Sequence, residues 1–255
     1  MSKTVSTWIS DTILRYLNKS TLRYAPFFAA DLATLRQVLE PCDVLLVEGN
    51  SRLSAIIKYL TQSSWSHAAL YIGDALEPPA PGTEPLVLLE AEAKPGVSVA
   101  PLSKYAAFNT RICRPMGLSD ADKKKVIDYA TRRIGMRYDS RQIVDLARYM
   151  FPYPPVPVAL RRRMLAIGSG DPTRAICSTL IGEAFTSIGY PILPDKAAHD
   201  GKPYAVAPFV QAESDHIRKH GLFTPRDFDI SPYFEVVKPR LTPDFDYRTV
   251  TWDVP

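Results

Sequence analysis

The chain has 255 residues, of which 46% are apolar, and a formal charge of +4. This length and apolar content exclude a disordered chain and allow one large or two small domains. The three cysteines are odd in number and far apart, and no stretch approaches 18 uninterrupted apolar residues. These features exclude a disulfide framework and a membrane span. The start also lacks the pattern of a secretory signal, so we expect a globular, cytoplasmic protein.

The first 40 residues are predicted to form a helical extension. Apolar side chains gather on one side of residues 8–17, and Asp31 is a good N-cap for a second helix that ends before Pro41. Such helices most often pack on their own domain. Contact with a membrane surface or a partner is the alternative interpretation.

Residues 41–240 are predicted to form the main domain. Short apolar runs rich in β-forming residues indicate strands over 43–48, 68–72, 86–93, 97–101, 110–114 and 233–237. Apolar residues at steps of three and four predict helices over 51–60 and 120–134 and a further helix that begins near Cys177 and stops at Gly189. The alternation of these elements predicts an α+β fold.

Cys177 is the first candidate for chemistry because it falls in the first turn of that further helix. Unpaired backbone N–H groups and the helix dipole favour a thiolate there. The dipole contributes only about 0.3–1 kcal/mol, whereas lowering a thiol pKa from about 8.5 to about 6 takes roughly 3.4 kcal/mol. A base is therefore needed nearby. Without one, a buried cysteine acts as a small apolar side chain.

His67 and Glu90 are the candidate partners of Cys177. His67 stands at the start of the strand predicted over 68–72, although a histidine at a sheet edge is often only a polar side chain. Glu90 and Glu92 share one face of the strand over 86–93, and a carboxylate on an apolar strand is costly unless paired. Glu90 lies deeper in the run, so we expect it to orient the imidazole. Both glutamates facing solvent is the alternative.

Residues 141–173 are predicted to be an insertion, and residues 241–255 a C-terminal tail. The insertion contains a proline-rich stretch followed by Arg161, Arg162 and Arg163. Arginines beside aromatic and apolar side chains can contact an anionic membrane surface or an acyl chain. A helical hairpin covering the core is the alternative. Basic runs elsewhere belong to no nucleic-acid-binding module, so we expect no nucleic-acid partner.

Several short motifs resemble the permuted branch of the NlpC/P60 papain-like hydrolases, the YiiX/YebB-like group related to lecithin:retinol acyltransferases. They are the sequences PCDVLLV from residue 41, WSHAALYIG from residue 65, LLEA from residue 88, GMRYD from residue 135 and ICSTLI from residue 176. The resemblance implies a permuted papain-like fold, with a small antiparallel sheet or barrel packed against helices. It also implies a nucleophile at a helix N-terminus. Cys42 stands where the family usually has glycine.

The resemblance implies Cys177 as nucleophile, His67 as base, Glu90 as orienting group and Tyr138 near the oxyanion. It predicts a cysteine hydrolase or acyltransferase that cleaves an amide, ester or thioester, without a cofactor or metal. We expect a small acyl or lipid substrate rather than a peptidoglycan stem, and peripheral contact with an anionic membrane. A cell-wall endopeptidase and a binding module with a lapsed site are the alternatives.

Overall fold

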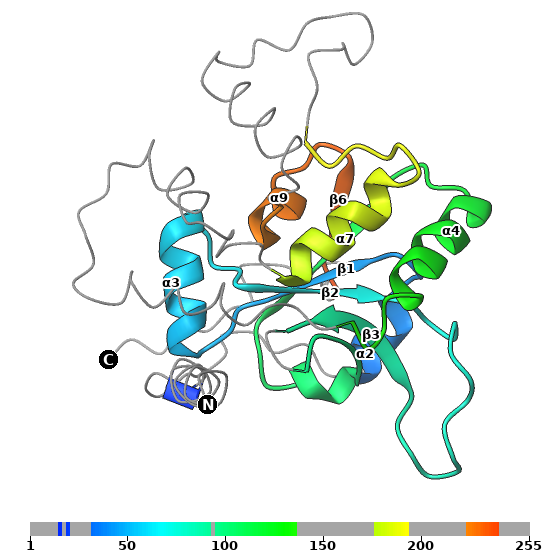
Figure 1. Cartoon of the computed structure of the whole chain (residues 1–255), viewed down its shortest axis with the longest axis horizontal. Helices are drawn as coiled ribbons and strands as arrows, with labels where there is room; N and C mark the ends of the chain where they lie inside the picture. Colours follow the sequence, from blue (N-terminus) through cyan, green and yellow to red (C-terminus); the bar gives the residue numbers. More distant parts are fainter. Residues whose placement is uncertain are drawn as a thin grey trace, which may run out of the picture.

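The computed structural model describes residues 15–16, 19–20, 32–92, 95–136, 176–193 and 223–239. Its centre is one antiparallel sheet of six strands in the order β4-β3-β2-β1-β5-β6 (Figure 1). The strands are β1 Val44–Val47, β2 His67–Tyr71, β3 Leu86–Ala91, β4 Val97–Pro101, β5 Thr110–Pro115 and β6 Phe234–Val237. All six lie within two or three residues of the runs predicted from the sequence.

The helices are α2 Leu32–Val38, α3 Arg52–Thr61, α4 Asp120–Thr131, α7 Ile176–Thr186 and the short α9 Pro225–Asp229, with one 3-10 turn, η1 Leu102–Tyr105. Four of the helices, α2, α3, α4 and α7, lie where the sequence predicts them, whereas α9 and η1 were not predicted. Of the predicted N-terminal helix, only Arg15 and Tyr16 are described, and both are helical. Tyr138, the insertion at 141–173 and the tail at 241–255 lie outside the described residues.

The sheet is buried on both faces because each strand sends alternate side chains to opposite sides. One face packs against α4, α7 and α9, which lie together in Figure 1, and its core contains Leu46, Leu70 and Leu89. The other face packs against α2 and η1 through Leu45, Ala69 and Leu88. Strands covered on both sides read as continuous apolar runs, which explains their sequence pattern.

The resemblance implied either an antiparallel sheet or a closed barrel, and the structure has the open sheet. Closing the sheet would require β4 to pair with β6, but the strand order places these two at opposite edges. Within the part of the chain that the structure describes, no helix has both the length and the apolar character needed to cross a membrane.

Gly182 fixes the position of α7 by allowing close contact with Phe223. A Cβ atom at this position would lie 2.2 Å from the Phe223 ring, closer than any real carbon contact. On the remaining sides of α7, Leu180, Ile181 and Phe185 are fully buried in the core. The helix that carries Cys177 is therefore held against the core by close packing.

A turn before β1 contains Cys42 in a left-handed conformation, with φ of 75°. Cys42 is fully buried, its N–H donates to the Tyr71 carbonyl at 2.9 Å, and its Sγ contacts the Lys123 carbonyl at 3.4 Å. A residue with a Cβ atom is strained here by about 1–2 kcal/mol. The backbone of this turn therefore suits a glycine, although a cysteine occupies the position.

Replacing Cys42 by glycine should therefore cost much less stability than the same change at Cys113. Both side chains are fully buried, but Cys113 lies in the regular strand β5. Glycine relieves strain at position 42, whereas in a strand it adds an entropic cost. We expect Cys113→Gly to lower the free energy of unfolding by about 2 kcal/mol more than Cys42→Gly. Urea denaturation measures both, and equal losses would contradict the strain at Cys42.

A buried ion pair ties the start of β1 to β5 and to the end of α2. The Asp43 side chain is 0% exposed and accepts two hydrogen bonds from Arg114, at 2.9 and 2.8 Å. The Glu40 N–H donates to the same carboxylate at 2.8 Å. Burial raises the pKa of Asp43 despite these donors. The carboxylate therefore depends on Arg114 to remain charged in the core.

Candidate active site

Three predicted site residues come from three different elements that meet at one end of the sheet. His67 is the first residue of β2, Glu90 lies near the end of β3, and Cys177 is the second residue of α7. The structure brings all three together. His67 and Glu90 approach from the sheet, and Cys177 approaches from the helix that packs on β2 and β3.

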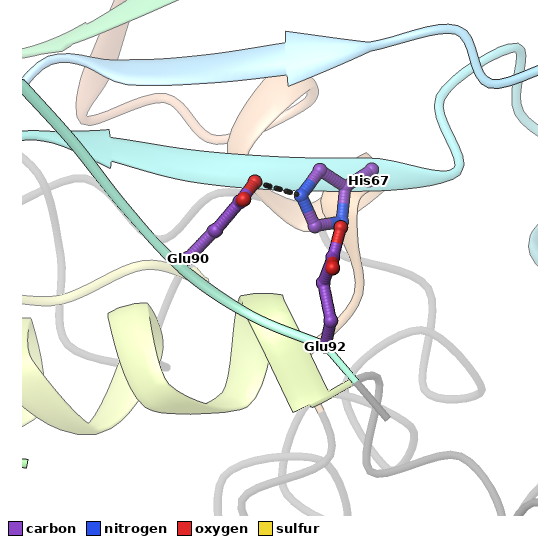
Figure 2. A group of neighbouring side chains, drawn as sticks. All are labelled: His67, Glu90 and Glu92. Atoms are coloured by element: carbon purple, nitrogen blue, oxygen red, sulfur yellow. Dashed lines mark hydrogen bonds and ion pairs between the residues drawn. The ribbon is translucent and has the colours of Figure 1, made fainter. Parts of the chain in front are cut away.

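The site forms where β2 and β3 separate. Their pairing joins Tyr71 with Leu88 and Leu70 with Leu89 and goes no further along these two described strands. Figure 2 shows β3 running away from β2 toward Glu92. The Ile72 N–H donates to Val87 on β3. Because alternate N–H groups of a strand point the same way, the N–H of Ala68 also points toward β3. It donates instead to the Cys177 sulfur.

Glu90, rather than Glu92, binds the His67 ring. The Glu90 Oε2 atom lies 3.0 Å from His67 Nε2 (Figure 2), and the side chains are 2% and 18% exposed. Burial favours a protonated Glu90, but hydrogen bonds from His67, Lys104 and Tyr105 and the charge on His67 lower its pKa to about 2. Glu90 is therefore a carboxylate at neutral pH, and it fixes the ring so that Nδ1 is left for another partner.

Two residues that the sequence did not identify hold the other positions of the Glu90 carboxylate. Lys104 Nζ donates to Glu90 Oε1 and also to Glu92 Oε1 at 2.8 Å. The Tyr105 hydroxyl donates to Glu90 Oε2, and its pKa is raised by burial and by the Glu90 charge. Both residues come from η1, a single turn after β4. The signal in the sequence is Leu-Ser-Lys-Tyr directly after a predicted strand, which is too common to single out.

Cys177 is hydrogen-bonded to His67. Burial favours the neutral thiol, but the charge and hydrogen bond of His67, with donors from Ala68 and Ser178, hold the pKa of Cys177 below its usual value. Burial also opposes charge on His67, yet Cys177 and Glu90 raise the pKa of the ring. These opposite shifts favour a thiolate beside an imidazolium at neutral pH, the reactive form of a cysteine nucleophile.

The other two cysteines have the opposite character. Burial is the main cause that raises the pKa of Cys42 to about 12, and burial also raises the pKa of Cys113. Both side chains are fully buried. All three cysteines are therefore buried free thiols, but Cys177 alone of the three has its pKa lowered, and the difference comes from the histidine beside it.

His67, Glu90 and Glu92 place one possible ligand atom each within 4.8 Å of one another, a spacing that a metal ion could use (Figure 2). The Lys104 ammonium is hydrogen-bonded to both carboxylates of this group. Lys104 therefore supplies a positive charge between the glutamates. We interpret the group as a charge network within the protein and assign none of its members as a metal ligand.

A comparison with known protein families gives one match. Residues 38–150 match the model of a family described as "Permuted papain-like amidase enzyme, YaeF/YiiX, C92 family". This span includes His67, Glu90 and Lys104, whereas Cys177 lies beyond it. No curated protein has significant sequence similarity to the chain.

Among solved structures, the chain is similar to one described as the metalloprotein yiiX from Escherichia coli O157:H7. The two chains are 18% identical, with a TM-score of 0.46, and the alignment covers 78% of this chain and 96% of that one.

Proposed function

Residues 38–150 belong to the permuted papain-like amidase family, and from this premise we propose that the chain is a cysteine amidase with Cys177 as nucleophile. His67 acts as the base and Glu90 as the group that orients it. The observation that carries the proposal is the chain of contacts from Glu90 through His67 to the Cys177 sulfur. A base held by a third group beside a nucleophile is the arrangement that covalent acyl transfer requires.

In the first half of the reaction, the Cys177 thiolate attacks the carbonyl carbon of the amide and a C–S bond forms. The His67 imidazolium then gives its proton to the leaving nitrogen as the C–N bond breaks. This yields a free amine and an acyl-thioester on Cys177. The N–H of Cys177 lies in the first turn of α7, where helical N–H groups have no intrahelical acceptor, and we assign it to the oxyanion.

In the second half, neutral His67 takes a proton from water, and the resulting hydroxide attacks the thioester. The C–S bond breaks, the acid leaves, and the thiolate and imidazolium are restored. An alcohol or amine in place of water gives acyl transfer. Glu90 remains ionised throughout and stabilises the imidazolium in both halves.

For the substrate, we propose an acyl amide with a lipid-like chain rather than a cell-wall stem peptide. Support comes from the sequence between residues 151 and 165, where aromatic and aliphatic residues adjoin three arginines. Apolar side chains suit an acyl chain and arginines suit an anionic head group. Hydrolysis of N-acyl amides of increasing chain length, compared with that of stem peptides, tests this choice. Cleavage of stem peptides alone would reverse it.

Glu90→Gln should lower kcat/KM by about 10²-fold, because the ring loses its orientation while the base remains. It should also move the alkaline limb of the pH profile to lower pH. The sign follows from the carboxylate, which raises the pKa of His67. Without it the imidazolium loses its proton at a lower pH. The pH dependence of kcat/KM for an acyl amide gives both results.

Glu92→Gln is the matched control, two positions along the same chain segment. It should cost less than tenfold, because Glu92 binds Lys104 while His67 Nε2 is bound to Glu90. Equal losses in the two variants would contradict the role of Glu90. If the chain were instead a binding module that has lost activity, the alkylation of Cys177 should follow the pKa of an ordinary thiol, about 8.5.

A further inference from the structure

The η1 turn presents a positive charge to the carboxylate pair beside the site. Its ends are anchored in the core, because Leu102 is 1% exposed and Tyr105 is 6% exposed. Lys104 lies between them, with a side chain that is 34% exposed. The buried residues on both sides fix the backbone of the turn, and from it the Lys104 ammonium donates hydrogen bonds to Glu90 and Glu92.

Lys104 and His67 compete for the same carboxylate. Lys104 donates to Glu90 Oε1, while His67 Nε2 and the Tyr105 hydroxyl bind Oε2. The charge of one carboxylate is thus shared between an ammonium and an imidazolium. Glu92 lies on the other side of Lys104 at 2.8 Å and adds a second negative charge. On this side of the ring, the two negative charges of Glu90 and Glu92 therefore face the positive charges of Lys104 and the His67 imidazolium.

We propose that Lys104 is a positioning residue that holds the Glu90 carboxylate against His67 and weakens its pull on the imidazolium proton. The inference rests on the proposed amidase function, since it concerns the proton that His67 gives to the leaving group. A base held too strongly by two carboxylates would keep its proton. The Lys104 charge offsets one of them, so the ring can both carry and release a proton.

Among the residues that the structure describes, the charged or titratable groups beside the ring all enter this balance. They come from β3 and the residue after it, from η1 and from α7: Glu90, Glu92, Lys104, Tyr105 and Cys177. Removing the positive charge at 104 makes the surroundings of the ring more negative by one charge. Removing the negative charge at 92 leaves Lys104 to act on Glu90 alone. The two changes should therefore move the proton affinity of His67 in opposite directions.

The test is an NMR titration of ¹⁵N-histidine-labelled protein without substrate. The chain has four histidines, and His67→Gln assigns the resonance of His67. We expect Lys104→Met to raise the apparent pKa of His67 by about one unit and Glu92→Gln to lower it by a smaller amount. Lys104→Arg keeps the charge and should leave the pKa close to that of the wild type.

An unchanged or lowered pKa of His67 in Lys104→Met would overturn the proposal. The proposal would also be overturned if the pKa of His67 shifted as much in Lys104→Arg as in Lys104→Met. The shift would then reflect lost packing and not the lost charge. Near-UV circular dichroism checks that the variants are folded, and Lys104→Gln serves if the methionine variant is not. Because the titration needs no substrate, failure of the amidase function would appear as absent hydrolysis in the wild type and leave this result separate.

Discussion

Cys177→Ala should abolish amide hydrolysis, with a loss in kcat of about 10⁴–10⁶-fold. The loss should be this large because the thiolate forms the covalent bond to the substrate. The methyl group of alanine cannot act as a nucleophile. His67→Ala should come close to the same loss, since nucleophile and base act as one unit. Hydrolysis of an acyl amide measures the loss in kcat. Labelling with a reactive acyl probe, followed by mass spectrometry, identifies the thiol that is acylated.

Cys113→Ala is the control for this prediction. Cys113 is as buried as Cys177, but the pKa of its thiol is raised by burial, so it has no thiolate to label. We expect labelling and hydrolysis near the wild-type values in this variant. Labelling that survives in Cys177→Ala and disappears in Cys113→Ala would place the nucleophile on β5, away from His67, and end the proposal.

Arg114→Met should destabilise the fold by about 3–5 kcal/mol, because it leaves Asp43 as an uncompensated charge in the core. The carboxylate is 0% exposed and loses two hydrogen bonds. Its pKa, already raised by burial, should rise further. Protonation then removes the unpaired charge, so the loss should be smaller at pH 5 than at pH 7. Chemical denaturation at the two pH values measures this.

Lys124→Met is the matched control for the buried pair. Lys124 pairs with Asp128 at 3.2 Å one helical turn away, but its side chain is 76% exposed. Exposed pairs of this kind contribute about 0.2–0.5 kcal/mol. A loss at Arg114 no larger than at Lys124 would show that Asp43 is not buried as a charge.

The sequence predicted the secondary structure well because its strands are buried on both faces. Runs such as residues 43–48 and 86–93 have few interpretations other than a core strand, and Gly189 marks the end of α7 clearly. The depth of Glu90 in its run also pointed to the right carboxylate for His67. These are local signals, and local signals can be read without knowing the fold.

What the sequence did not predict depends on contacts between distant segments. Lys104 reaches Glu90 because the sheet places β4 beside β3, and Arg114 reaches Asp43 because β5 pairs with β1. Neither residue stands out in its own segment. The separation of β2 from β3, which frees the Ala68 N–H for Cys177, is likewise a property of strand pairing. The open sheet follows from the same long-range order.

The order of the site residues along the chain has a consequence for synthesis on the ribosome. His67 and Glu90 lie on strands that are made early, whereas Cys177 follows His67 by 110 positions. At about 5–20 residues per second, the ribosome needs roughly 5–20 s to cover that interval. During this time His67 and Glu90 exist without the Cys177 thiol. If Cys177 is the nucleophile that we propose, a nascent chain of this protein cannot form an acyl-thioester until the helix that carries Cys177 has emerged.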